Sequence, residues 1–350
     1  MRRVVLLPLV ALLILHIAIL FAGFFAPYAP DRQNRNFAFA PPTFLHLIDS
    51  RGKLHFRPFV YGLRTSASGS YEVDNSRIFP LRFLVHGDTY RIAGFWPSRL
   101  HLFGVEELGA VFLMGTDDYG RDQLSRFLMG AQVSLLAGAA AALLALSIGT
   151  IVGAVAGFYG RFADDALMAA AELFLSLPWF YLLLGVRATL PLDLEPRQAF
   201  LVIICVLGTV GWARPARLVR GVVLSARHRE FVQAARGFGA SNIYLLRRHV
   251  LPQTRGVLVT QATLLIPQYI LAEVSMSFLG LGVNEPAASW GLMLANLREY
   301  YALVSHWWMW IPAFLIIPVF FMFYALASTL GALNVSQMHI VSRPNSATDG

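Results

Sequence analysis

Long apolar runs constrain the fold of this chain more than any other feature, because about 20 apolar residues in a helix suffice to cross the hydrocarbon core of a bilayer. Hydrophobic residues make up 57% of the sequence and charged residues only 14%, far from the average of water-soluble domains. The sequence therefore predicts an all-α integral membrane protein with about six transmembrane helices. The candidate spans are residues 4–26, 133–158, 163–186, 199–212, 257–282 and 307–330.

Arginine positions predict how these spans are oriented, because short loops that carry Lys and Arg stay on the cytoplasmic side. Residues 214–255 hold nine arginines and one acidic residue, Glu230, whereas the loops near Pro191 and Trp290 hold two arginines and one. We expect this basic loop and both termini to be cytoplasmic. The net charge of +8 then reflects membrane topology, and we expect no binding of nucleic acid.

On this basis the chain divides into four parts. Residues 1–26 form an N-terminal transmembrane helix, which we expect to stay uncleaved because no small-x-small site ends its apolar run. Residues 27–114 form an extracytoplasmic insert, where residues 55–63 and 83–92 mix aromatic, β-branched and polar residues as short strands do. We predict a small β-rich insert; an irregular ordered loop is the alternative. Residues 115–332 form the membrane core with its basic loop at 214–256, and residues 333–350 form a cytoplasmic tail.

The basic loop contains residues suited to a short surface helix followed by a sharp turn. Ala234 and Ala235 allow a helix to lie close to a partner, and Gly239 can end that helix in a left-handed conformation. Ser241 is a good N-cap for a following helix, which we expect to run until Pro252. The functional interpretation is force transmission to another protein, and the alternative is an ordinary cytoplasmic helical hairpin. The residues assigned to this segment are Glu230, Gln233, Ala234, Ala235, Gly239, Ala240, Ser241, Asn242, Leu251 and Pro252.

A second motif, at residues 115–122, precedes the second apolar run. Its glycines and aspartates supply left-handed conformers and side-chain bonds to the backbone, and Arg121 can pair with a neighbouring carboxylate. Taken alone, such a motif is more often only a compact turn. Its residues of interest are Gly115, Thr116, Asp117, Gly120, Arg121 and Asp122.

Three segments, in order, resemble signatures of ABC importer permeases. Residues 115–122 are similar to the GTDxxGRD signature of the C-type dipeptide, oligopeptide and nickel permeases. Residues 233–252 resemble the EAA loop of the family, with Gln233 in place of the usual Glu and His249 where many members have Ile. Residues 272–283 and 286–294 resemble the fifth helix and the outer loop. The likeness covers most of residues 115–300 and weakens in the last helix, where residues 325–331 depart from the family's usual end.

The resemblance implies a permease of the type I ABC importer fold, in the inner membrane, that takes up di- or oligopeptides by alternating access. It implies three kinds of partner: a homologous second permease, two ATP-binding subunits and an extracytoplasmic solute-binding protein. ATP and Mg are expected on the ATP-binding subunits, with no cofactor on this chain. The residues agree, because the only lysine, Lys53, is followed by Leu54 and cannot belong to a Walker loop. Similar subunits also handle nickel complexes and sugars.

Two carboxylates fall inside the candidate spans, where charge is costly, so each should face the bundle interior or a cavity. For Glu273 the alternatives are a pathway or gate residue and an interhelical hydrogen bond. Glu172 lies shortly before Pro178. Its alternatives are a role in the pathway and a solvated position near the cytoplasmic interface. The rival function is a self-contained secondary transporter or channel that uses these carboxylates for ion coupling. A membrane enzyme is less favoured, because the sequence shows no nucleophile, base or metal cluster.

Overall fold

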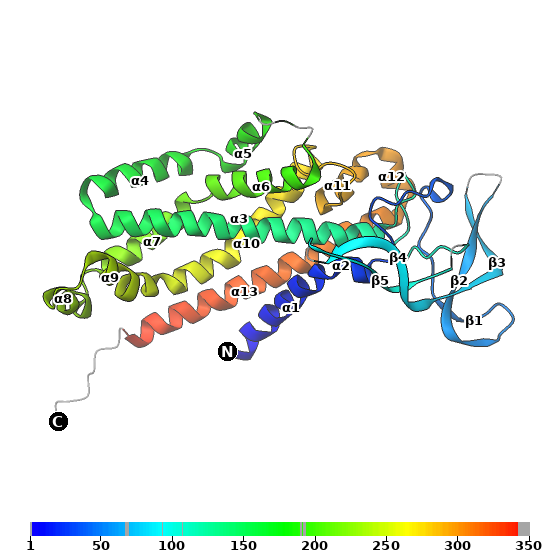
Figure 1. The fold of residues 1–350 in the computed structure, drawn as a ribbon, viewed down its shortest axis with the longest axis horizontal. Helices are drawn as coiled ribbons and strands as arrows, with labels where there is room; N and C mark the ends of the chain where they lie inside the picture. Colours follow the sequence, from blue (N-terminus) through cyan, green and yellow to red (C-terminus); the bar gives the residue numbers. More distant parts are fainter. Residues whose placement is uncertain are drawn as a thin grey trace, which may run out of the picture.

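The computed structural model describes residues 2–66, 70–92, 94–106, 108–189, 191 and 194–341. It is an elongated helical bundle with β-strands at one end (Figure 1). The strands are β1 (His46–Ile48), β2 (Leu54–Thr65), β3 (Tyr71–Pro80), β4 (Arg82–Ile92) and β5 (Trp96–Gly104). The helices are α1 (Arg2–Leu20), α2 (Ala22–Phe25), α3 (Gln123–Tyr159), α4 (Arg161–Ser176), α5 (Trp179–Ala188), α6 (Pro196–Val210), α7 (Ala213–Ala226), α8 (Glu230–Gly237), α9 (Asn242–Leu245), α10 (Arg255–Phe278), α11 (Trp290–Ala295), α12 (Tyr300–Ser305) and α13 (Ile311–Val341).

Helix α3 is the central element, and small residues let its neighbours approach it closely. It is 37 residues long and packs against α6, α7 and α10. A Cβ at Gly153 would collide with the backbone of α7, and one at Gly138 would collide with Ile270 of α10. Close packing of small residues stabilises helix pairs in a bilayer, where lipid tails are as apolar as the side chains they contact.

Among the described residues, three helical runs are long and apolar enough to cross a membrane: Gln123–Tyr159, Asn242–Phe278 and Trp307–Leu330. Two bent pairs, α4 with α5 and α6 with α7, raise the number to five if each pair is one span. The apolar part of α1, Leu6–Leu20, is shorter than these. Helices therefore occupy every candidate span, while length and composition support three to five crossings.

One of the candidate spans breaks into two helices, and another ends at a bend. The run at residues 163–186 breaks after Ser176, and α4 and α5 meet at 89°. Proline has no N–H and disfavours helical backbone in the residue before it, and Leu177, which precedes Pro178, is indeed extended with ψ 140°. The run at residues 199–212 lies mostly in α6, which meets α7 at 44°.

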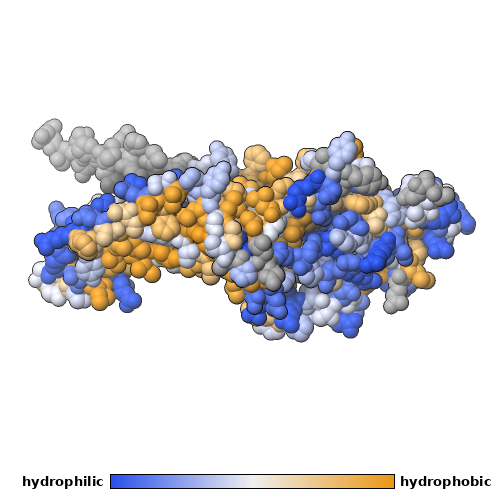
Figure 2. All heavy atoms as spheres, turned by 90° about the horizontal axis from the view of Figure 1, so that it is seen from above, coloured by the Kyte–Doolittle hydropathy of each residue, from blue (hydrophilic) through white to orange (hydrophobic). Residues whose placement is uncertain are grey.

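The strands form two antiparallel sheets in the segment where the sequence predicts them. Strand β2 pairs with β1 and β3, and β4 pairs with β5. Val60, Leu81 and Val111 form a small buried core of this insert. The insert lies at the opposite end of the bundle from α8 and α9 (Figure 1). Figure 2 shows apolar side chains along the bundle between hydrophilic surfaces at its two ends, as expected for a body that crosses a bilayer.

Candidate functional site

Residues 230–252, which we name the coupling segment after the role predicted for them, form the tip of the bundle farthest from the strands (Figure 1). Its first helix, α8, ends in a turn at Gly239, which has the left-handed conformation that the sequence predicts, with φ +85°. The N–H of Gly239 donates to the carbonyl of Arg236 (2.9 Å), and the N–H of Ala240 donates to that of Ala235 (3.1 Å). These bonds satisfy carbonyls at the end of α8, so the turn has a defined geometry.

After this turn the chain continues from α9 into α10 without a break. Ser241 caps α9 as predicted, because its hydroxyl accepts from the N–H of Tyr244 (3.3 Å). The prediction that this helix ends at Pro252 is wrong, since Asn242–Phe278 forms one helical run. The backbone widens to a π-helical turn at Leu246–Val250 and tightens to a 3-10 turn at Leu251–Thr254. Irregular turns of this kind accommodate the missing N–H and the ring of a proline.

The outer surface of the coupling segment carries exposed large side chains, which we name the apical patch: Phe231, Phe238, Ile243 and Tyr244. Phe238 is 93% exposed. With Tyr244 and Gly239 it helps to line a cleft of about 540 Å³. Exposed apolar clusters mark surfaces that contact other molecules. The sequence analysis missed the apical patch, although aromatic residues in a basic loop were an available signal.

The inner face of the coupling segment is a small hydrophobic core. Val232, Leu245 and Val250 are buried against α7 and the end of α3, and Ala235 is partly buried beside them. The other predicted residues of the first turn and the loop, Glu230, Gln233, Ala234, Ser241 and Asn242, are exposed. Segment and bundle therefore share one core, while these five exposed residues face outward.

Arg220 of α7 and Arg227, which directly follows α7, join the helices at this end of the bundle. Arg227 donates through Nη1 to the carbonyls of Gly157 (3.0 Å) and Phe158 (3.2 Å) at the end of α3. Arg220 pairs with Asp164 of α4, with Nη2 and Oδ2 2.6 Å apart. Helices α3, α4 and α7 are thus linked next to the coupling segment by charge-assisted bonds, which are stronger than neutral ones.

The turn at residues 115–122 lies at the other end, between the insert and α3. Gly115 and Gly120 have φ +72° and +71°, which L side chains rarely adopt. A Cβ at Gly120 would lie 1.9 Å from the carbonyl oxygen of Asn34, so glycine is also needed for space. Asp122 caps α3 by accepting from the N–H of Ser125 (2.8 Å).

A charge cluster with two buried arginines and an exposed glutamate is built on this turn. Arg121 pairs with Asp117 through Nε and Oδ2 (2.7 Å), the neighbouring carboxylate that the sequence predicts. Glu285, from the loop after α10, bridges Arg121 (2.7 Å) and Arg126 (2.8 Å). Arg126 also donates to the carbonyl of Pro30 (3.1 Å). The sequence analysis missed Arg126 and Glu285, which join α3, the first residues of the insert and the loop after α10.

Thr116 and Asp122 are further buried polar groups of the same turn. The Thr116 hydroxyl accepts from the N–H of Ala40 (2.7 Å), and its carbonyl accepts from the indole N–H of Trp308 (3.2 Å). Burial raises the pKa of Asp122 to about 7. Every residue predicted for this motif therefore takes part in a buried junction, which is a structural role rather than an open binding site.

The structure separates the two carboxylates of the candidate spans. Glu172 on α4 is exposed on the surface of this chain, so it does not face the interior of the chain's own bundle. Glu273 on α10 is fully buried, and its Oε1 accepts from the hydroxyl of Ser277 (2.7 Å). The hydroxyls of Ser134 and Ser289 also lie beside its carboxyl group. The hydrogen bond to Ser277 lies within α10, and Ser134 of α3 and Ser289 before α11 place the Glu273 carboxyl group where three elements meet.

Residues 149–332, more than half of the chain, match the family described as binding-protein-dependent transport system inner membrane component. The protein belongs to this family. The matched region contains the coupling segment and both carboxylates, and it begins after the turn at residues 115–122.

Peptide permeases are among the relatives of this family member. It is 39% identical over 217 residues to the dipeptide transport system permease protein DppC of Bacillus subtilis (strain 168), covering 62% of this chain and 66% of that protein. It is 37% identical over 209 residues to the oligopeptide transport system permease protein OppC of Haemophilus influenzae, covering 60% and 65%. The chain thus spans just under two thirds of the length of these relatives. A chain of the MetNI methionine ABC transporter in inward-facing conformations aligns with a TM-score of 0.42 and 18% identity, covering 59% of this chain and 95% of that one.

Proposed function

We propose that this protein is the permease subunit of an ATP-driven importer for di- or oligopeptides and that it forms half of the translocation path. Family membership supports the transport role, and the names of the relatives support peptides as the cargo. The observation that carries the proposal is the apical patch, an exposed aromatic surface held firmly at the tip of a bundle with helices of membrane-crossing length. A self-contained transporter has no need of such a docking surface.

The proposed complex contains a homologous second permease, two ATP-binding subunits that hold ATP and Mg, and an extracytoplasmic solute-binding protein. The apical patch docks on an ATP-binding subunit, and the insert faces the solute-binding protein. The location of the coupling segment and the insert at opposite ends of the bundle supports this arrangement (Figure 1). In the inner membrane the chain crosses six times, with both termini cytoplasmic. Nucleotide chemistry belongs to the partners, and no nucleic acid is involved.

Force passes from the apical patch to the membrane core along two routes. The first is the shared core of Val232, Leu245 and Val250 with α7 and α3, which moves those helices together with the coupling segment. The second is the unbroken helical run from Asn242 to Phe278, which makes α10 a direct extension of α9. Because packed interiors shift between discrete arrangements instead of deforming gradually, movement of the tip reorients the helices around the path.

Substitution of Phe238 by alanine tests this proposal. A central aromatic anchor of an interface contributes about 2 kcal/mol or more, and each 1.4 kcal/mol changes affinity about tenfold. Phe238→Ala should therefore weaken binding of the ATP-binding subunits at least about tenfold and abolish ATP-dependent peptide uptake, with normal amounts of the permease in the membrane. Affinity is measured on the purified permease pair, and uptake in proteoliposomes.

Phe56→Ala is the matched control, because Phe56 is an equally exposed aromatic residue (103%) in the insert at the opposite end. It should bind the ATP-binding subunits like the wild type. Unchanged binding and uptake in Phe238→Ala would contradict the proposed docking role of the apical patch.

A further inference from the structure

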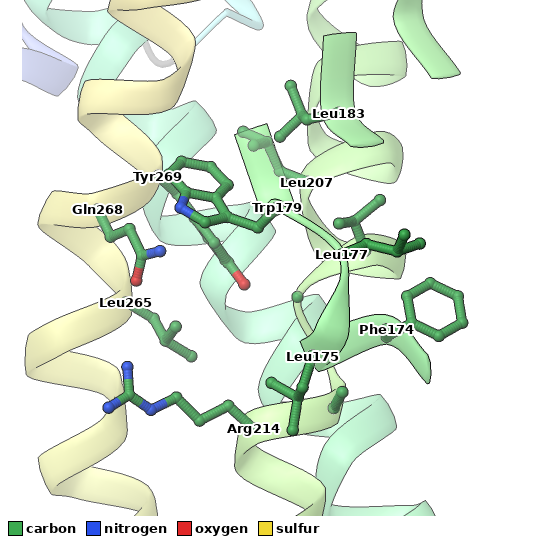
Figure 3. A pocket seen from close by; sticks show the side chains of 13 residues that line it. Phe174, Leu175, Leu177, Trp179, Leu183, Leu207, Arg214, Leu265, Gln268 and Tyr269 are labelled. Atoms are coloured by element: carbon green, nitrogen blue, oxygen red, sulfur yellow. The ribbon is translucent and has the colours of Figure 1, made fainter. Parts of the chain in front are cut away.

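Irregular helices meet around one cavity in the membrane core. The α4–α5 bend at Leu177, the α6–α7 bend at Gly211 and the stretch of α10 after its internal Pro267 line this cavity (Figure 3). Irregular backbone at membrane depth is tolerated where it lines a cavity or is covered by protein. The convergence of two bends on one space, beside a helix that carries an internal proline, indicates that the space itself has a use.

The cavity has room for one side chain and a mostly apolar wall. Its volume is about 160 Å³. That is close to the ~150 Å³ of an engineered protein cavity that binds benzene, so a single apolar group fits and a whole peptide does not. Leu183, Leu207 and Leu265 are buried in its wall, while Leu177 and Trp179 are exposed at its rim.

Tyr269 directs a polar atom into this apolar space. Its side chain is buried (2% exposed), and its hydroxyl has no hydrogen-bond partner in the described part of the chain. Figure 3 shows this hydroxyl pointing into the cavity, with the Gln268 amide on the same side. Gly211 leaves room for it, since a Cβ there would lie 1.6 Å from the Tyr269 oxygen. A buried polar group without a partner costs about 1–3 kcal/mol, which a ligand in the cavity would recover.

We propose that this cavity is a side-chain subsite of the translocation path. It receives one apolar residue, aliphatic or aromatic, of a peptide in transit, and the Tyr269 hydroxyl and Gln268 amide bond to the peptide group beside that residue. A mostly apolar pocket with a few directed polar groups is the usual design of a small-ligand site. The inference rests on the proposed function and adds to it: the permease itself, as well as the solute-binding protein, discriminates among peptides.

Filling the cavity tests the subsite. Val210 lines it and is partly buried, so Val210→Leu fills it in part and Val210→Phe fills it with a ring. Initial uptake of Ala-Ala-Ala and Ala-Phe-Ala is compared in proteoliposomes that contain the complete complex and its binding protein. We expect Val210→Phe to lower uptake of Ala-Phe-Ala at least tenfold relative to Ala-Ala-Ala, with Val210→Leu between it and the wild type. Leu264→Phe is the control, because Leu264 is exposed on α10 outside the cavity.

Tyr269→Phe tests the polar half of the subsite, since it keeps the ring and removes only the hydroxyl. It should raise the KM for both peptides by a similar factor and leave their ratio unchanged, because the peptide group is common to both. The proposal is overturned if the ratio of Ala-Phe-Ala uptake to Ala-Ala-Ala uptake is the same in Val210→Phe as in the wild type, even when both rates fall. If Val210→Phe does not assemble, Val210→Leu decides by the same criterion. If instead the proposed function itself is wrong, the wild-type complex will take up neither peptide in the presence of ATP.

Discussion

Glu273 shows at the scale of one residue how a polar group can be used in the membrane core. Its carboxyl group lies where α10 meets α3 and the start of α11, with Ser277, Ser134 and Ser289 around it. Hydroxyl groups both donate and accept, so they can satisfy a carboxyl group without any counter-charge. A residue that moves ions or gates a path needs its charge, whereas one that joins helices needs only its hydrogen bonds.

Substitution of Glu273 separates these two roles. Glu273→Gln keeps most of the hydrogen-bonding capacity and should preserve both the yield of the assembled complex and ATP-dependent uptake. Glu273→Ala leaves the buried serine hydroxyls without their partner and should lower both, because each unsatisfied buried group costs about 1–3 kcal/mol. Yield and uptake are measured on the same preparations. Normal yield with lost uptake in Glu273→Gln would instead assign Glu273 to the path or its gate.

At the scale of elements, the start of α3 is held by its own N-cap and by groups from two distant parts of the chain. Asp122 provides the N-cap, Arg126 reaches the carbonyl of Pro30, and Glu285 closes the cluster from the loop after α10. Removing one member of a buried ion pair is costly, because its partner stays buried without compensation. The ends of α3 and α10 that lie near the insert are therefore linked to each other.

The cap of α3 makes a pH-dependent contribution to stability. Burial raises the pKa of Asp122 from 3.8 to about 7, so the folded protein binds this proton more tightly than the unfolded chain. The stabilisation is fully present below the pKa of Asp122 in the unfolded chain, 3.8, and is lost as the pH rises toward its pKa in the folded protein, about 7. Asp122→Asn stays neutral and keeps an oxygen for the cap, so its Tm should depend less on pH than that of the wild type between about pH 4 and 7.

Thermal unfolding of the purified protein in detergent, followed across this pH range, measures the difference. Asp122→Ala is the control, because it removes the cap as well. It should lower the free energy of unfolding by about 1 kcal/mol and therefore lower the Tm at every pH. Parallel pH profiles for the wild type and Asp122→Asn would show that Asp122 does not titrate in this range.

Features that depend on neighbouring residues could be predicted from the sequence, and long-range contacts could not. Gly239 and Ser241 have their predicted conformations because a turn and a cap are decided within a few residues. Glu285 lies 164 residues from Arg121 and 159 from Arg126, and nothing near it in the sequence marks it as their partner. Hydropathy also described residues 163–186 as one span, although Pro178 carried the local signal for the bend.

At the scale of the whole molecule, the two ends of the bundle have different structures and different proposed partners. Strands and the charge cluster occupy one end, and the coupling segment with its arginines occupies the other (Figure 1). The described part of α13 runs toward the coupling segment (Figure 1). A membrane placed across the apolar middle (Figure 2) puts the insert and the coupling segment on opposite sides. The positive charge of the short loop is the basis on which we predict that the coupling segment is cytoplasmic.

Cysteine labelling tests this orientation, and the chain suits it because its one native cysteine, Cys205, can be replaced by serine. Ser241→Cys in the coupling segment and Thr65→Cys in the insert are both at exposed positions. With a membrane-impermeant maleimide, Thr65→Cys should react in spheroplasts, where only the outer face of the membrane is accessible. Ser241→Cys should react only in inside-out vesicles, because the bilayer separates the two ends of the bundle. The Cys205→Ser background serves as the unlabelled control. Reaction of both cysteines from the same side would show that the bundle does not cross the membrane between them, and the six-crossing arrangement would then have to be abandoned.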